Sequence, residues 1–250
     1  MRFERLDQIR NLLDNEKSIT LDELCRRMEV SKNTIRRDIV QLEKEGRIQK
    51  FYGGIRLIEN NDAPTPFTER EITNSEAKMD IAKKAAKLVL PGEVIYIDSG
   101  TTTMHMVQFL VNTPDITIIT TSLHVMLAAS KYKINLIGVG GTLYFPAKSF
   151  VGAGTVLSLS QYNIGKVFMS SSGITLKQSV TNANLLECEN KRAVMRNNAE
   201  KFLLIDNSKF GRSALMTYAQ VSDFNAIITN HITSPEYKQM LDKLKVSIIQ

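Results

Sequence analysis

Cationic and amide side chains gather on one face of the segment from residue 31 to residue 42. Ile35, Ile39 and Leu42 recur at helical spacing and predict a buried stripe. The opposite face carries the polar residues Lys32, Asn33, Arg36, Arg37 and Gln41. Arg and Asn side chains make bidentate hydrogen bonds to guanine and adenine, and Lys and Arg neutralise backbone phosphates. This face therefore predicts contact with DNA, although a basic helix face can also be simply solvated.

A second set of polar residues follows five short apolar runs farther along the chain. The members are Asp98-Ser99-Gly100-Thr101-Thr102-Thr103, Thr120-Thr121-Ser122, Gly138-Val139-Gly140-Gly141, Ser170-Ser171-Ser172-Gly173 and Asp206-Asn207-Ser208-Lys209. Hydroxyls and free amides suit a phosphorylated ligand, and Ser99 to Thr102 precede a helix-like run at 104–110 whose N-terminus would attract an anion. Each of these sets alone is an ordinary turn. ATP is not favoured, because the sequence has no GxxxxGK[ST] loop.

The residues before the basic face predict a helix-turn-helix. Thr20 and Glu23 have capping-box spacing, with the Glu side chain reaching back, so a helix should begin at Leu21. Its apolar stripe is Leu21, Leu24, Cys25 and Met28. The segment 29–31 has room only for a turn, and Ser31 can cap the second helix. In a helix-turn-helix, that second helix lies in the major groove.

A glycine-tipped hairpin is predicted directly after the second helix. Apolar residues alternate around Gly53-Gly54 at Ile48, Phe51, Ile55 and Leu57. The flanking basic residues are Arg47, Lys50 and Arg56. The pattern indicates either a wing over phosphates and the minor groove or a plain structural hairpin that closes the domain. An amphipathic helix should precede the motif, because Leu6, Ile9 and Leu13 share a face.

The rest of the chain has the pattern of an α/β domain. Largely apolar runs occur at 94–97, 116–119, 134–139, 167–169, 202–205 and 226–228, with helix-like segments between them. Such runs are typical of buried, mostly parallel strands with helices on both faces. Ligands of an open α/β sheet bind beyond the carboxyl ends of its strands, which is where the second polar set is expected.

Composition changes mark the domain boundaries. We predict a DNA-binding domain at 1–58, a linker at 59–75 and an effector domain at 76–250, because Glu59 to Pro66 is polar and interrupted by proline. Helical patterning resumes from Phe67 to Leu90 and suggests a long helix entering the second domain. Ile81, Ala85, Leu88 and Val89 are expected to form its packed face.

Charge and composition restrict the class of protein. The 250 residues carry a formal net charge of +6 and the pI is near 9.2, which suits a polyanionic partner. No apolar run approaches about 18 residues and the charged N-terminus has no signal-peptide core, so a soluble, cytoplasmic protein is expected. Two distant cysteines and three scattered histidines predict neither a disulfide framework nor a metal site. No cofactor is expected.

Two strings in the head, VSKNTIRRD and LEKEGRIQKFYGG, resemble the winged helix of the DeoR family of bacterial transcriptional repressors. The later strings YIDSGTTT, TTS, GVGG, SFVG and DNSKFG resemble its sensor domain, so the similarity covers nearly the whole chain. The resemblance implies a sensor related to sugar-phosphate isomerases such as ribose-5-phosphate isomerase. Within the family, LDELC, YIDSGTTT and SALMTY are most similar to repressors of inositol catabolism.

The basic face, the hairpin and the resemblance together give the expected site residues. The DNA contacts are expected from Ser31, Lys32, Asn33, Thr34, Arg36, Arg37, Gln41, Arg47, Lys50, Tyr52, Gly53 and Arg56. The effector contacts are expected from Asp98, Ser99, Gly100, Thr101, Thr102, Thr121, Ser122, Gly140, Gly141, Asp206 and Lys209. By analogy with the family, Ser99 to Thr102 hold the phosphate, while Asp98 and Lys209 address the sugar hydroxyls or carbonyl.

The expected function is a repressor that binds an operator in double-stranded DNA as a homo-oligomer, dimer or tetramer. A phosphorylated sugar or inositol-derived effector would release it. One alternative is a sugar-phosphate isomerase-like enzyme with a fused DNA-binding head, using acid–base groups among Asp98, Glu187, Lys191, Asp206 and Lys209. A general nucleic-acid-binding protein is a second alternative, but it leaves the strand-end hydroxyls unexplained.

Overall fold

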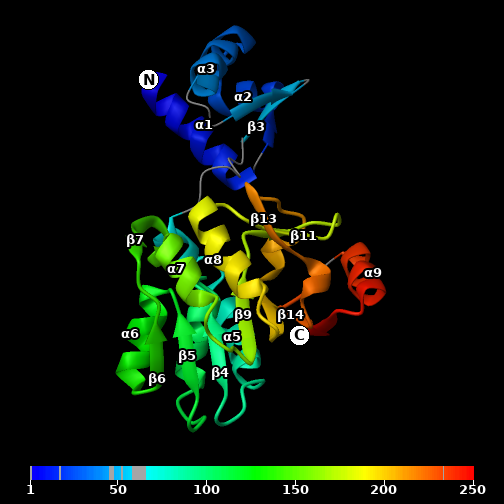
Figure 1. Cartoon of the computed structure of the whole chain (residues 1–250). Helices are drawn as coiled ribbons and strands as arrows, with labels where there is room; N and C mark the ends of the chain where they lie inside the picture. Colours follow the sequence, from blue (N-terminus) through cyan, green and yellow to red (C-terminus); the bar gives the residue numbers. More distant parts are fainter. Residues whose placement is uncertain (1, 17, 45–47, 52, 58–65, 233) are drawn as a thin grey trace. The chain divides into compact units, whose positions relative to one another are not determined.

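The computed structural model describes residues 2–16, 18–44, 48–51, 53–57, 66–232 and 234–250. The chain divides into two compact units, residues 1–60 and 61–250 (Figure 1). The predicted boundary at residue 58 and residues 59–65 of the predicted linker lie outside the described residues, whereas residues 67–72 of that linker are helical.

The first unit packs three helices against a small antiparallel sheet. The helices are α1 (Arg2–Glu16), α2 (Leu21–Met28) and α3 (Lys32–Lys44), and the sheet has the order β1-β3-β2 from β1 (Ser18–Thr20), β2 (Ile48–Phe51) and β3 (Gly54–Leu57). Its buried core is Leu6, Ile9, Leu13, Ile19, Leu24, Ile35, Ile39, Leu42, Ile48 and Ile55. The apolar stripes predicted for all three helices are therefore confirmed.

The start of α2 matches the prediction in part. The Thr20 hydroxyl accepts the Glu23 amide at 3.2 Å, which caps the helix as predicted. The Glu23 carboxylate does not reach back; it binds Arg26 and Arg27, because both cations lie within one turn of it. Strand β1 was not predicted. It is only three residues long and is defined by its pairing with β3.

The second unit is built on a seven-stranded parallel sheet of order β15-β14-β12-β9-β4-β5-β6. The strands are β4 (Val94–Ile97), β5 (Thr117–Thr120), β6 (Asn135–Gly138), β9 (Lys166–Ser170), β12 (Glu200–Leu204), β14 (Ala226–Ile228) and β15 (Ser247–Ile249). Six of them correspond to the predicted runs, and β15 was missed. The α/β prediction with a parallel sheet is confirmed.

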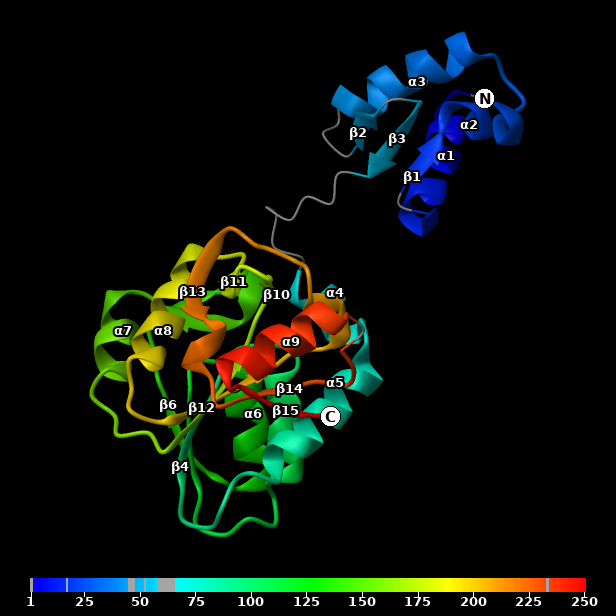
Figure 2. The ribbon, with the colours of Figure 1, turned by 90° about the vertical axis from the view of Figure 1, so that its right-hand side faces the viewer.

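Helices cover both faces of this sheet, as Figure 2 shows. On one face pack α5 (Ser75–Ala86), the 3-10 helix η1 (Thr103–Phe109) and α6 (Leu123–Tyr132). On the other pack α7 (Ala153–Leu159), α8 (Leu185–Met195) and α9 (Pro235–Leu244). Strand residues alternate between the two layers: Ile95 and Ile97 join the first, and Tyr96 joins the second.

The long helix predicted for residues 67–90 is wrong. The segment forms α4 (Phe67–Ile72) and then α5, because Asn74 lies between them in the left-handed region at φ +54°. The predicted packed face is nevertheless present, since Ile81, Ala85 and Val89 are buried and Leu88 is partly buried against them.

Short antiparallel elements complete the second unit. They are the hairpin β7 (Thr142–Tyr144) with β8 (Ser149–Val151), and the sheet of β10 (Gly173–Ile174), β11 (Ser179–Asn182) and β13 (Met216–Gln220). Both follow strand ends of the large sheet and therefore add walls at its carboxyl edge. Among the described residues, no helix is long and apolar enough to cross a membrane.

Candidate nucleic-acid interface and ligand site

Helix α3 presents the basic face that the sequence predicts. Ser31, Lys32, Asn33, Arg36, Arg37 and Gln41 are exposed, and Thr34 is partly buried. Ser31 begins the helix by accepting the Thr34 amide at 3.3 Å. Within the described part of the chain, the structure gives Arg36 and Arg37 neither an ion pair nor a hydrogen bond. Both guanidinium groups are therefore available to a partner.

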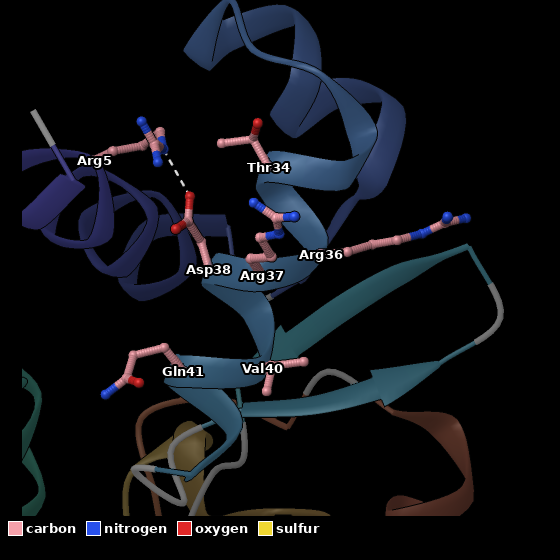
Figure 3. Close-up of a pocket in the computed structure, with 7 residues that line it drawn as sticks. All are labelled: Arg5, Thr34, Arg36, Arg37, Asp38, Val40 and Gln41. Atoms are coloured by element: carbon pink, nitrogen blue, oxygen red, sulfur yellow. Dashed lines mark hydrogen bonds and ion pairs between the residues drawn. The ribbon is translucent and has the colours of Figure 1, made fainter.

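Arg36, Arg37 and Gln41 line a shallow pocket on this face together with Arg5, Thr34, Asp38 and Val40 (Figure 3). In the same view Arg36 extends on the side of the β2–β3 hairpin, and Gln41 points to the opposite side. The buried Asp38 carboxylate accepts from Arg5 at 2.6 Å, which fixes α1 against α3. The ion pair therefore fixes the orientation of α3 and of the exposed side chains that it carries.

Two lysines of the expected interface are paired with carboxylates on the surface. Lys32 lies 2.5 Å from Asp22, and the hydrogen bond to that carboxylate raises the pKa of Lys32. Lys50, on β2, pairs with Glu43. Exposed ion pairs of this kind are weak, so DNA phosphates can replace both carboxylates at little cost.

The hairpin next to α3 has the predicted glycine tip. Gly53 is exposed at φ +87°, a conformation that favours glycine, and Arg56 lies on β3 opposite Gln49 of β2. Arg47 and Tyr52 lie outside the described residues.

In the second unit, the sheet order brings all five polar sets to one edge. The strands β12, β9, β4, β5 and β6 are consecutive neighbours and parallel, so their carboxyl ends lie side by side. The chain starts at β4, adds β5 and β6 on one side, and then adds β9 and β12 on the other. The switch point therefore lies between β4 and β9, which is where open α/β sheets bind ligands.

A buried ion pair occupies this switch point. Asp98, directly after β4, accepts from the Lys191 ammonium group of α8 and from the Ser170 amide and hydroxyl, at 3.0 and 2.5 Å. Asp98 and Lys191 are 1% and 2% exposed. The Tyr218 hydroxyl donates to the Ser170 carbonyl at 2.8 Å, and burial raises the pKa of Tyr218 so that the phenol stays neutral. The pair joins β4, β9 and α8 at a single point.

The turn after β4 is packed tightly against this pair. Ser99 donates to the Glu187 carboxylate at 3.1 Å, while Thr103 bonds the carbonyls of Asp98 and Gly100. A Cβ atom at Gly100 would lie 2.2 Å from the Ser170 hydroxyl, so only glycine fits there. Thr101 and Thr102 are each 5% exposed.

The helix expected after this turn is a 3-10 helix. It spans Thr103–Phe109, and the Met104 and His105 amides already bond the carbonyls of Gly100 and Thr102. Fewer amides are free than at the start of an α-helix. An anion near this turn must therefore gain much of its binding energy from other groups.

The β5 and β6 ends form the other wall. The Thr121 hydroxyl lies 3.2 Å from that of Ser149 on β8, and Ser122 caps α6 through the Val125 amide. Gly140 and Gly141 are exposed, and the Gly140 carbonyl accepts from Thr155 at 2.8 Å. These groups bind one another, so they shape the wall more than they present free donors.

The β12 end carries an excess of positive charge. The buried Asp206 carboxylate accepts from the Ser208 amide and from Asn74. Beside it, burial lowers the pKa of Lys78 to about 8; Asp206 opposes this shift and the Lys209 cation adds to it. Burial also lowers the pKa of Lys209. The Asp206 carboxylate opposes both shifts electrostatically, by favouring the charged form of each amine.

Lys78 also acts electrostatically on the helix after β4. Burial lowers the pKa of His105, and the Lys78 cation lowers it further. The His105 amide bonds the Thr102 carbonyl, and the Lys78 ammonium group itself donates to the Arg70 carbonyl.

Four residues of the site were absent from the expected effector set. They are Lys78, Ser170, Glu187 and Lys191. Lys78 could have been identified from the sequence, because a charged residue stands in the apolar stripe of α5, three and four residues before Ile81 and Ala82. No group of three or more metal-ligating side chains occurs within the described ranges.

Comparisons with known proteins agree with both units. Residues 5–61 match the model of the DeoR-like helix-turn-helix domain, and residues 73–231 match that of the DeoR C terminal sensor domain. The transcriptional regulator IolR of Bacillus subtilis is 39% identical over 249 residues, covering 99% of each chain. The lactose phosphotransferase system repressor of Staphylococcus aureus is 30% identical and covers 92% of each chain.

Among solved structures, ribose 5-phosphate isomerase A from Methanocaldococcus jannaschii aligns with a TM-score of 0.41 and 23% identity. The alignment covers 55% of this chain and 55% of that one, so the chain spans about half the length of the isomerase. The two family models cover both units of the chain, and the curated relatives match it along nearly its whole length. The chain therefore belongs to the DeoR family and is a DNA-binding transcriptional regulator.

Proposed function

We propose that this regulator is a repressor of a carbohydrate (sugar or inositol) catabolic operon, and that a phosphorylated effector relieves its binding to the operator. We infer the chemical class of the effector from the distribution of charge along the carboxyl edge of the sheet. Cations exceed carboxylates at the β12 end, whereas carboxylates and hydroxyls line the β4 end.

The phosphate is proposed to bind between the amines of Lys78 and Lys209 and the turn at Thr101 and Thr102. A desolvated ammonium group near a second cation is stabilised by an anion that pairs with both. The hydroxyls of Thr101 and Thr102 are proposed to donate to the same phosphate. This assignment keeps the phosphate near the turn expected from the sequence and adds the cations that the 3-10 helix alone does not supply.

The hydroxyls of the effector are proposed to lie toward Asp98 and Glu187. Neighbouring strands are about 4.8 Å apart, so the β12 and β4 ends are separated by about 10 Å. A phosphorylated six-carbon compound is long enough to bridge that distance. Its hydroxyls can donate to the carboxylates, since a carboxylate accepts several hydrogen bonds.

The heads are proposed to act in pairs. One winged helix reads only a few base pairs, so a homo-oligomer on paired half-sites gains specificity. Effector binding would shift the oligomer toward a state whose heads no longer match the half-site spacing. Such a regulator works in the cytoplasm, where bacterial DNA is found.

Thermal unfolding of the full chain in the presence of paired phosphorylated and unphosphorylated sugars and inositols tests the effector class. A ligand at about 100 times its dissociation constant adds about 2.7 kcal/mol of stability. A shift confined to phosphorylated compounds supports the proposal, and the same compounds should then release DNA selected from a random pool. Equal shifts with both series would contradict it.

An isomerase-like activity is the competing proposal. Asp98, Glu187 and Lys191 place two carboxylates and an amine at the switch point, and such groups can transfer protons beside a carbonyl. Interconversion of aldose and ketose phosphates by the purified protein would support an enzyme. Binding without turnover supports a sensor.

A further inference from the structure

Asn190 of α8 has one buried polar atom without a partner. The residue is 3% exposed, and its Nδ2 donates to the Phe150 carbonyl at 2.8 Å. Its Oδ1 is buried and accepts no hydrogen bond. Leaving a buried polar group unpaired costs free energy, so each such atom calls for a physical explanation.

The chemical identity of the unpaired atom is fixed by its neighbour. A backbone carbonyl only accepts hydrogen bonds, so the amide atom next to Phe150 must be the nitrogen. The remaining atom is therefore an oxygen, and it needs a donor. An anionic phosphate oxygen cannot satisfy it, whereas a hydroxyl group can.

Asn190 lies in the wall of the site already described. Glu187, Asn190 and Lys191 are three and four residues apart, so they share one face of α8. Glu187 accepts from Ser99, and Lys191 donates to Asp98. Phe150 follows Ser149, whose hydroxyl contacts Thr121 at the β5 end. Asn190 thus lies between the β4 and β5 ends of the sheet.

We propose that Asn190 Oδ1 accepts a hydrogen bond from a hydroxyl of the effector and thereby selects a polyhydroxylated ligand. The inference rests on the proposed effector site and adds a specificity-determining residue to it. Asn190 reads the hydroxylated part of the ligand, and the cations near β12 hold the phosphate.

Substitution by leucine, Asn190→Leu, removes the acceptor with little change in size. Asn197→Leu is the matched control, because Asn197 Nδ2 makes the same kind of bond, 2.8 Å to the Tyr162 carbonyl, beyond the C-terminal end of α8. Asn190→Ala is the second variant, in case leucine does not fit. The probes are inorganic phosphate, glucose 6-phosphate, fructose 6-phosphate and myo-inositol 1-phosphate, measured by calorimetric titration and thermal shift on the full chain.

We expect Asn190→Leu and Asn190→Ala to weaken binding of the best phosphorylated polyol by about tenfold, the loss of one well-placed hydrogen bond. Binding of inorganic phosphate should be unchanged, and Asn197→Leu should bind both as the wild type does. Without ligand, Asn190→Leu should melt no lower than Asn197→Leu, because it also removes an unpaired oxygen.

Three results would overturn the inference. If the Asn190 variants bind the polyol phosphate as tightly as the wild type, Oδ1 serves some other donor. An equal loss for inorganic phosphate would mean that the substitution disturbs the whole site. Failure of the wild type to bind any of the three polyol phosphates would instead reject the proposed effector class, and this inference with it.

Discussion

Replacing Lys191 by methionine should destabilise the second unit, because the substitution leaves the Asp98 carboxylate buried without its cation. Removing one partner of a buried ion pair costs about 3–5 kcal/mol. Here Asp98 keeps two donors from Ser170, at 3.0 and 2.5 Å. The Ser170 carbonyl also keeps its bond from Tyr218. We therefore expect the lower end of the range, about 3 kcal/mol.

Calorimetric unfolding of the full chain measures this cost. For a unit of this size, 1 kcal/mol corresponds to about 2–4 °C, so the transition of the second unit should fall by about 6–12 °C. The double variant Asp98→Asn with Lys191→Met should recover much of the loss, because it removes both charges. The reasoning is refuted if the double variant loses as much stability as the Asp98→Asn and Lys191→Met variants do together. It is also refuted if Lys191→Met costs less than about 1 kcal/mol.

Lys166 provides a matched control at the opposite edge of the sheet. It is 6% exposed, lies 2.6 Å from Glu93 and begins β9, whereas Ser170 ends that strand. Lys166→Met should also lower the melting temperature. Only Lys191→Met should also weaken the stabilisation by phosphorylated compounds, because Lys191 holds the Asp98 carboxylate to which the effector hydroxyls are proposed to donate.

Three further predictions follow from the two sites. Arg36→Ala should weaken operator binding by about 1–3 kcal/mol in a fluorescence anisotropy titration and leave the effector-induced thermal shift unchanged. If the variant lost both operator binding and the thermal shift, the DNA and effector sites would not be separate. Affinity for a phosphorylated compound should fall as the pH rises from 7 to 9, because Lys78, with a pKa of about 8, loses the charge that pairs with phosphate. Calorimetry should show this dependence flattened in Lys78→Arg, whose charge persists, and an unchanged slope would remove Lys78 from the phosphate site. Gly100→Ala should lower the melting temperature by the equivalent of about 1–3 kcal/mol, because its Cβ would overlap Ser170, whereas Gly154→Ala, with nothing within 4 Å, should not.

Local signals in the sequence were sufficient for the helices of the head and for most of the large sheet. Helix α2 begins after Thr20 and α3 after Ser31, because each hydroxyl accepts a hydrogen bond from the amide three residues on, a relation contained within one turn. Strands β4 and β14 coincide with their apolar runs, since burial on both faces requires near-continuous apolar side chains. Where the signal was weak, as in the three-residue strands β1 and β15, the element was missed.

The arrangement of the candidate ligand site depended on contacts that no local pattern contains. The sequence specified polar residues at five strand ends, but only the sheet order places Ser170 beside Asp98, 72 residues away, and only the packing of α8 brings Lys191 to it across 93 residues. The same holds for Lys78, which α5 carries to the β12 end. Propensity and capping act over one or two turns, so they fix where elements begin and end. The choice of neighbouring strands is set by burial of the whole sheet, and it is this choice that brings the separate polar turns together at one edge.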